Sequence, residues 1–471
     1  MIRLLRSISI MFFLLFCTFL FAQNKFLMEN CFPVSKVIII DSDYNLNGDT
    51  LRFPQGSKLV FKGGKIDNGV IVGNNTHISV KQDNPIFGID LIIEGRWSVK
   101  KVYDRWFEYK SDSTFVSNRI IRNILALSND DTYCHIYFNE PRIYYYQLEY
   151  KGPPNIWDIV SFRTVNGKSE RYWDEIYYEK YSSLRIFTIP SNTHLTINNT
   201  MKMLPTKAGA YYVFWEYGKE NIVVDGYGTI YGDSRCHHYF FNKEGKYTYS
   251  GEWGYIFKCI KCKNFSFRDI TLSDAHGDAL SFDSSRYIDE KDNRNSFGLK
   301  VENVKIKYAR RNGMSIAARN VRIWNCSFEG CGIDEIYGTA PRAAIDFEPD
   351  DLFLFPEIGN VNVVMKNCVF KNNKHDVSST NNNLPSYGRF ATIIKDCKFT
   401  APVRLNATYW IKFQNCTIPG FTNWINNISE KTPFKYLLFE KCVIDSMPSI
   451  MKTESWHNSF VNCEVKNMKM H

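Results

Sequence analysis

The stretch Ile323-Trp324-Asn325-Cys326-Ser327-Phe328 decides the fold, because its pattern returns along the rest of the chain. In each copy an apolar residue stands three positions before a cysteine and another stands two positions after it. The cysteines are Cys326, Cys368, Cys397, Cys416, Cys442 and Cys463. The apolar residues before them are Ile323, Met365, Ile394, Phe413, Phe439 and Phe460, and those after them are Phe328, Phe370, Phe399, Ile418, Ile444 and Val465.

A short strand pattern that recurs at irregular spacing, with the same inward residues, is typical of a parallel β-solenoid. Each coil stacks on the next, so like residues form ladders along the axis. Ile270 carries the same pattern upstream without the sulfur. The residues directly before the cysteines are Asn325, Asn367, Asp396, Asn415, Lys441 and Asn462. We therefore predict an all-β chain whose stacked coils form a long surface able to hold a ligand.

The composition agrees with a large folded solenoid. A chain of 471 residues exceeds the usual size of a single core, but each coil of a solenoid packs only on its neighbours. A hydrophobic content of 44% excludes disorder, and 28 Tyr, 35 Phe and 10 Trp suit stacked cores or the binding of sugar rings. The sequence has no block of basic residues, so nucleic-acid binding is not predicted.

Residues 1–22 have the pattern of a signal peptide. Arg3 and Arg6 precede an apolar run from Ile8 to Phe21, and Ala22 follows it. Cleavage would remove two positive charges and change the formal net charge from +9 to +7, which mildly favours acidic glycans as partners. We predict an exported protein, periplasmic or extracellular, without stable membrane insertion after cleavage.

Cysteines in an exported protein usually indicate disulfides, but stacking explains six of these thirteen. In a core, cysteine behaves as a small hydrophobic residue. Cys259 and Cys262 have the spacing of a redox or metal site, yet neither a second pair nor a nearby histidine completes one. We expect a structural role for this pair.

The chain divides into four segments by pattern. After the signal peptide, residues 23–110 contain short β-branched stretches and glycine turns, typical of a small N-terminal β element. Residues 111–183 begin with a helical period over Thr114–Ser128, which predicts one short helix capping the solenoid, and continue with a strand and an aromatic insertion. Residues 184–471 are predicted to form the coils that carry the site.

The repeat is broken in three consecutive coils, which begin at Asn264, Asn303 and Asn320. Functional residues in a repeat protein concentrate where the pattern is violated. Strand alternation predicts three inward pairs: Leu280 with Phe282, Met314 with Ile316, and Ile345 with Phe347. It also predicts two outward ladders: Ser281, Ser315 and Asp346 in one, and Asp283, Ala317 and Glu348 in the next.

The acidic residues of these coils are candidates for glycoside hydrolysis. Asp283 and Glu348 lie two coils apart, which corresponds to roughly 10 Å at about 4.8 Å per coil. An inverting glycosidase holds its acid and its base roughly 6.5–9.5 Å apart so that a water molecule fits between them. We predict Glu348 and Asp283 as the acid/base pair and Asp346 and Asp278 as alternates, because clustered carboxyls raise one pKa. The structural alternative for each is turn capping.

Four further residues are predicted to contact the substrate. Arg310 and Arg311 lie between the carboxylates in sequence and suit an acidic sugar, and His276 suits orientation or proton transfer. Trp253 is a candidate for stacking on a sugar ring, although core packing is the alternative.

These motifs together resemble a known family. The runs Gly251–Gly254, His276–Leu280, Arg311–Ile316, Gly338–Pro341 and Ile345–Pro349 are similar to exported bacterial right-handed parallel β-helix proteins of the pectate-lyase superfamily, often called polygalacturonase-like. The resemblance implies a right-handed parallel β-helix. It does not transfer the polygalacturonase site, because Gly277-Asp278 stands in place of the Asp pair and Asn312-Gly313 in place of Gly-His-Gly. Arg322-Ile323-Trp324 is predicted on a core strand and does not replace the family's Arg-Ile-Lys.

The leading prediction is a monomeric exported glycoside hydrolase that binds a polysaccharide or oligosaccharide, acidic ones included, without a metal or other cofactor. A first alternative is a polysaccharide lyase that uses Arg310 or Arg311 as the base and carboxylate-bound calcium. A second alternative is a non-catalytic glycan-binding scaffold built on the same coils.

Overall fold

The computed structural model divides the chain into two compact units, Met1–Lys110 with Arg119–Ile136, and Ser111–Asn118 with Tyr137–His471. The structure describes residues 36–110, 116–149, 162–165, 168–171, 184–241, 245, 247–248, 253–284, 295–348, 360–380, 390–406, 408–422, 434–452, 454 and 457–469. The predicted signal peptide and most of the predicted aromatic insertion lie outside these residues. Among the described residues, no helix has the length and apolar character needed to cross a bilayer.

The first unit contains short parallel strands and the helix. Its elements are β1 (Val37–Ile40), β2 (Tyr44–Asn45), β3 (Thr50–Arg52), β4 (Lys58–Phe61), β5 (Ile66–Asp67), β6 (Gly69–Val80), β7 (Leu91–Trp97), β8 (Lys101–Tyr103), the 3-10 turn η1 (Asp104–Trp106) and α2 (Asn118–Ala126). β6 pairs in parallel with β3, β4 and β7, so the predicted N-terminal β element is itself built from parallel strands. Asn123 of α2 accepts from the backbone N–H of Ile93 at 3.0 Å and donates to the carbonyl of Leu91 at 2.7 Å, which fixes the helix within this unit.

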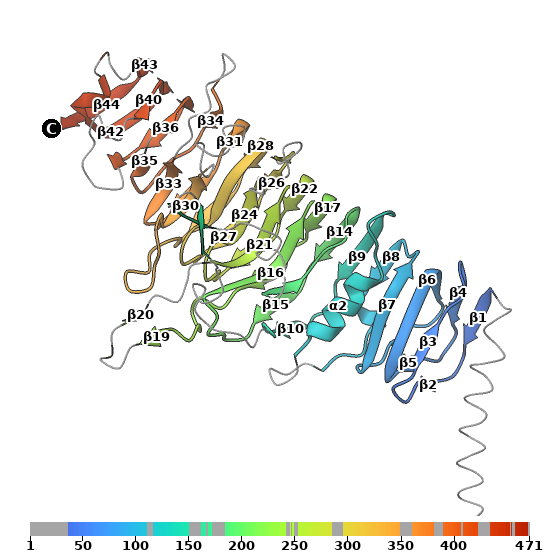
Figure 1. The fold of residues 1–471 in the computed structure, drawn as a ribbon. Helices are drawn as coiled ribbons and strands as arrows, with labels where there is room; N and C mark the ends of the chain where they lie inside the picture. The colour runs from blue at the N-terminus through green and yellow to red at the C-terminus, as the bar shows by residue number, and fades with distance from the viewer. Residues whose placement is uncertain are drawn as a thin grey trace, which may run out of the picture. The chain divides into compact units, whose positions relative to one another are not determined.

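The second unit is a right-handed parallel β-helix with three faces (Figure 1). Face 1 contains β13 (Arg185–Phe187), β16 (Ala210–Tyr217), β21 (Trp253–Ile260), β24 (Leu280–Asp283), the first part of β28 (Met314–Trp324), β30 (Ala343–Phe347), β33 (His375–Thr380), β35 (Val403–Asn406) and β39 (Phe421–Thr422). Face 2 contains β14 (Thr193–Ile197), β17 (Glu220–Asp225), β22 (Lys263–Arg268), β25 (Ser296–Phe297), β26 (Lys300–Glu302), the rest of β28, β31 (Val361–Lys366), β34 (Thr392–Lys395), β37 (Ile411–Gln414), β41 (Leu438–Glu440) and β43 (Ser459–Val461). Face 3 contains β10 (Ile143–Tyr146), β15 (Thr200–Met203), β18 (Thr229–Tyr231), β23 (Thr271–Ser273), β27 (Lys305–Lys307), β29 (Ser327–Glu329), β32 (Val369–Lys371), β38 (Thr417–Ile418), β42 (Val443–Pro448) and β44 (Glu464–Lys469).

The remaining elements are short. They are β9 (Cys134–Phe138), the antiparallel pairs β11 (Phe162–Val165) with β12 (Lys168–Arg171) and β19 (Phe240–Phe241) with β20 (Tyr247–Thr248), the parallel pair β36 (Thr408–Tyr409) with β40 (Phe434–Lys435), and the 3-10 turn η3 (Ser449–Lys452). β10 pairs in parallel with β15, so parallel stacking on face 3 begins at Ile143, before the predicted start of the coils at residue 184.

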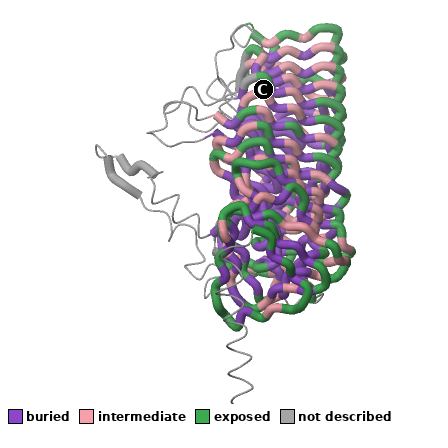
Figure 2. Tube along the Cα trace, turned by 90° about the vertical axis from the view of Figure 1, so that its right-hand side faces the viewer, coloured by how far each residue is buried: buried purple, intermediate pink, exposed green. Residues whose placement is uncertain are grey.

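The core ladders follow the predicted register. On face 2, Ile323 pairs with Met365, and the ladder continues through Ile394, Phe413 and Phe439 to Phe460. The repeated cysteines Cys326, Cys368, Cys397, Cys416 and Cys442 are buried, and Cys463 is half-buried. Figure 2 shows the buried positions inside the coils and the exposed ones along their outer corners. The recurring cysteine is therefore a core residue, as predicted.

The residue before each cysteine explains the recurring asparagine. At Asn325, Asn367, Asp396, Asn415, Lys441 and Asn462 the backbone φ lies between 52° and 55°. This left-handed conformation is tolerated best by glycine and asparagine. The side chains also stack, since the Asn367 amide donates to Asn325 Oδ1 at 2.8 Å. The corners between faces 2 and 3 are thus closed by a hydrogen-bonded ladder.

Candidate functional site

The structure confirms the predicted alternation on face 1. Ser281 pairs with Ser315, and Ser315 pairs with Asp346, so these three residues form one ladder. Asp283 pairs with Ala317 in the next ladder. Glu348 directly follows Phe347, which pairs with Ile316, so Glu348 continues the ladder of Asp283 and Ala317. The six predicted inward residues of these strands are all buried.

Asp278 lies at the corner that leads into β24 and is a fully bonded carboxylate. The Nη1 atom of Arg311 donates to its two oxygens at 3.1 and 2.9 Å. The backbone N–H of Asn312 and the hydroxyl of Ser315 donate to it at 3.1 and 2.6 Å. A carboxylate offers about four acceptor positions, so this set leaves none for a substrate. Asp278 therefore positions Arg311 and the next coil.

Arg311 connects this corner to Glu348. Its Nη2 atom lies 3.5 Å from a carboxylate oxygen of Glu348, and its Nε donates to the carbonyl of Ala340 at 3.0 Å. The side chain of Glu348 is 26% exposed, whereas that of Arg311 is only 12% exposed. Glu348 is thus the carboxyl of this group that combines a fixed position with access to solvent.

Asp346 lies two residues before Glu348 on the same outward side of the chain. It is completely buried, and burial raises its pKa well above the usual range. Repulsion from the neighbouring Glu348 carboxylate raises this pKa further, and Arg311 opposes the shift. Burial thus favours the protonated form of Asp346, and a raised carboxyl pKa is what a general acid requires.

Asp283 has the opposite environment. Lys258 on the preceding coil forms an ion pair with it, and the Ser281 hydroxyl donates to it at 2.6 Å. The Lys258 ammonium also donates to Ser281 Oγ at 2.9 Å and lies 4.6 Å from the centre of the Tyr255 ring. A cation and a hydroxyl donor both favour the ionised form of a carboxyl. Asp283 is thus held in place by Lys258 and Ser281.

The other predicted substrate contacts have different surroundings. Arg310 is 3% exposed and donates to the backbone carbonyls of His276 and Tyr337. His276 is fully buried beneath the same corner. Arg310 thus satisfies carbonyl groups of these turns, and contact of Arg310 and His276 with a substrate stays a prediction. Trp253 is half-buried and packs on a cluster formed by Leu184, Ala210, Tyr212, Trp215 and Tyr255, so core packing describes it best.

Sequence reasoning missed two residues that extend the Asp346 ladder. Ser378 pairs with Asp346, and Arg404 pairs with Ser378. Arg404 Nη1 donates to the Pro341 carbonyl at 2.7 Å, while burial lowers the arginine pKa and Asp346 opposes that shift. The only available signal was the position of Ser378 and Arg404 in the strand alternation of β33 and β35, which carry no motif.

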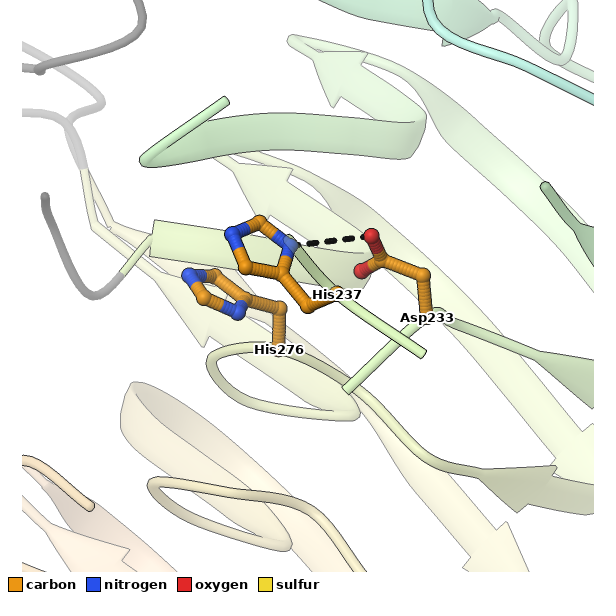
Figure 3. Close-up of side chains that lie close together, drawn as sticks. All are labelled: Asp233, His237 and His276. Carbon is orange, nitrogen blue, oxygen red and sulfur yellow. Dashed lines mark hydrogen bonds and ion pairs between the residues drawn. The ribbon is translucent and has the colours of Figure 1, made fainter. Parts of the chain in front are cut away.

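A second polar cluster was also missed, and it lies at the corner between faces 3 and 1 (Figure 3). Asp233 accepts from His237 Nδ1 at 2.9 Å, from the Tyr211 hydroxyl at 2.7 Å and from the Thr206 N–H at 3.0 Å. The rings of His237 and His276 stack with centroids 3.8 Å apart and an interplanar angle of 24°. One ligand atom from each of Asp233, His237 and His276 lies within 4.8 Å of the others.

This cluster does not fit a metal ion. A bound metal needs nitrogen lone pairs that converge on one point about 2.0–2.1 Å away, and the lone pairs of stacked imidazoles run nearly parallel. The carboxylate of Asp233 is already bonded to three donors, and Arg310 Nη2 lies 3.4 Å from His276 Nε2. A guanidinium in that position repels a second cation. We therefore assign the cluster to the packing of the corner.

Comparison with known proteins gives no family. No family model matches the chain. A stretch of 203 residues is 28% identical to the uncharacterized protein YclG of Bacillus subtilis (strain 168), and it covers 42% of this chain and 33% of that protein. The chain thus aligns with about a third of the length of this relative.

Several solved structures are similar to the chain at a low level. The tailspike protein gp49 of Acinetobacter baumannii bacteriophage Fri1, a capsular polysaccharide depolymerase, is 11% identical with a TM-score of 0.40, and the match covers 78% of this chain and 57% of that one. The A-module of mannuronan C-5 epimerase AlgE4 from Azotobacter vinelandii is 8% identical with a TM-score of 0.34, covering 79% and 100%. The Streptococcus pneumoniae surface adhesin PfbA is 11% identical with a TM-score of 0.28, covering 92% of both chains. Similarity at this level carries no argument about activity.

Proposed function

We propose that this protein is an exported, carbohydrate-active enzyme, a glycoside hydrolase that cleaves a polysaccharide on face 1. One observation carries the proposal. A buried carboxyl with a raised pKa, Asp346, lies beside the partly exposed Glu348, and the carboxylate of Asp283 lies in the same ladder as Glu348, two coils away.

The two carboxyl environments suit an acid and a base. The proton held by Asp346 passes through the Glu348 carboxylate to the leaving glycosidic oxygen, and a proton from solvent restores Asp346 after the products leave. Asp283, paired with Lys258, orients a water molecule for attack on the anomeric carbon, accepts the proton that this water loses and later releases it to solvent. Two coil spacings place Asp283 and Glu348 roughly 10 Å apart along the backbone. That separation is near the range of inverting glycosidases, so we infer an inverting mechanism.

Ala317 pairs with Asp283 and separates it from Glu348 along the ladder. Its side chain is a methyl group with 3% exposure, so Asp283 and Glu348 are the polar groups of this part of the ladder. Lys258 and Arg311 are each paired with a carboxylate, so the charges of this ladder favour neither an acidic nor a neutral polysaccharide.

The lyase alternative receives less support. A base must first lose its proton, and hydrogen bonds to carboxylates or carbonyls favour the charged guanidinium. Arg310 donates to two backbone carbonyls, and Arg311 donates to Asp278 and lies beside Glu348. The oxygens of Asp278 are bonded within the protein, so they suit calcium poorly. The non-catalytic scaffold remains the second alternative.

A panel of acidic and neutral polysaccharides tests the class of activity. The protein is incubated with each polymer, once with calcium and once with a chelator, and the products are assayed for new reducing ends and for the ultraviolet absorbance of unsaturated sugars. We expect reducing ends without that absorbance, at equal rates under both conditions. Absorbance that requires calcium would establish a lyase, and saturable binding without any product would establish the scaffold.

A further inference from the structure

The C-terminal end of the cysteine ladder combines neighbouring thiols with access to solvent. Cys442 and Cys463 stand at equivalent positions in adjacent coils, because β41 pairs with β43 and β42 pairs with β44 in register. The backbone N–H of Cys442 donates to Cys463 Sγ at 3.4 Å. Equivalent residues in adjacent coils have Cα atoms about 4.8 Å apart, within the 4.4–6.8 Å range of disulfides.

The two thiols differ in exposure. Cys442 is 1% exposed, and its neighbour in the preceding coil, Cys416, is 2% exposed. Cys463 is half-buried, since β43 and β44 are the last described strands of their faces. A thiol reagent in solution therefore reaches Cys463 first. The Cys442 thiol lies next to Cys463 in the ladder, so it is placed to attack a mixed disulfide formed on Cys463.

We propose that Cys442 and Cys463 are a disulfide-forming pair that covalently joins the last two described coils in an oxidising compartment. The oxidant is a small-molecule disulfide such as oxidised glutathione. The Cys463 thiolate attacks it, which forms a mixed disulfide and releases one glutathione thiolate. The Cys442 thiolate then attacks the Cys463 sulfur and releases the second glutathione. Two protein thiols lose two protons and two electrons, and one glutathione disulfide becomes two thiols.

The consequence is local stability. Among the described strands, the coil of β43 and β44 stacks on one neighbouring coil, and such a coil opens more readily than a coil with two neighbours. A bond between Cys442 and Cys463 closes the chain around this coil and limits the open states. The inference does not depend on the enzymatic activity proposed above.

Peptide mapping tests the pair. The reduced protein is incubated with oxidised glutathione, its remaining thiols are alkylated under denaturing conditions, and the digest is analysed by mass spectrometry. We expect one linked peptide that joins Cys442 to Cys463, with Cys326, Cys368 and Cys397 alkylated. Because burial raises the pKa of Cys463, the link should form faster as the pH rises. A Cys416–Cys442 link, a stable glutathione adduct on Cys463, or full alkylation of all these thiols would overturn the proposal.

Hydrogen exchange provides a second measurement with matched variants. Oxidation should slow amide exchange in β43 and β44 of the native protein and of Cys397→Ser, whose thiol lies inside the ladder. It should have no effect on Cys463→Ser. Equal slowing in Cys463→Ser would show that another reaction causes the protection and would contradict the assigned pair.

Discussion

The ion pair between Asp278 and Arg311 gives the sharpest stability prediction. Replacing Asp278 with alanine removes the acceptor of two hydrogen bonds from Arg311 and of one each from Asn312 and Ser315. The Asp278 and Arg311 side chains are 1% and 12% exposed, so the arginine would keep a charge with little access to water. Removing one partner of a buried pair costs about 3–5 kcal/mol. We expect Asp278→Ala to lower the free energy of unfolding by an amount in this range.

A double-mutant cycle separates the pair from its surroundings. Arg311→Ala should also cost about 3–5 kcal/mol, because it leaves the buried Asp278 with neutral donors only. The double variant leaves neither charge, so its loss should be about 2 kcal/mol smaller than the sum of the single losses. As a matched control, the exposed pair Arg96–Asp131, with side chains 52% and 63% exposed, should contribute no more than about 1 kcal/mol.

The assay is denaturant unfolding combined with hydrogen exchange. Repeat arrays depart from two-state unfolding, so global midpoints alone are insufficient. The faster exchange should be centred on the corner between β23 and β24 and on the start of β28. A loss below about 1 kcal/mol for Asp278→Ala, or strictly additive losses in the cycle, would refute the assignment of Asp278 to positioning.

Three further outcomes follow from individual residues. The pKa of Asp346 in the folded protein is raised above its usual 3.8, so this carboxyl ionises at lower pH in the unfolded chain than in the folded one. The free energy of unfolding therefore falls as the pH rises above about 4. In urea titrations, Asp346→Asn should become more stable relative to the native protein between pH 4 and 7. Burial chiefly lowers the pKa of His375 from 6.5 to about 4, so the unfolded chain binds this proton at higher pH than the folded one. The free energy of unfolding therefore falls as the pH drops from 6.5 to about 4. In the same titrations, the free energy of unfolding of His375→Asn should depend less on pH in this range. Asn325 has a φ of 55°, so Asn325→Ala should cost about 1–2 kcal/mol and Asn325→Gly less; equal losses would exclude backbone strain as the cause.

The solenoid was predictable because its determinants are local and repeated. The spacing of Cys326 and its equivalents fixed both the inward side and the corner, and the register of face 2 matches that spacing. The start of the parallel coils was not predictable, since no cysteine stands before β10 or β15 at the position of Cys326.

The candidate site was predictable only as a set of residues. Alternation placed Asp283, Asp346 and Glu348 on the correct ladders. It gave no information about their partners, because hydrogen bonds such as those of Asp278 join separate coils. The pairing of Lys258 with Asp283 depends on the stacking of β21 on β24, which the sequence does not state.

The most direct test of the central claim compares the native protein with Glu348→Gln on a polysaccharide that the native protein cleaves. The measured quantity is the initial rate at which new reducing ends appear. General acid catalysis contributes about 10²–10⁴-fold, so the account predicts a loss of that size for Glu348→Gln and a comparable loss for Asp283→Asn. Glu329→Gln is the matched control, because its side chain is 22% exposed and pairs with Lys371 on face 3. It should retain the native rate. A Glu348→Gln rate equal to that of the control would contradict the assignment of the catalytic acid.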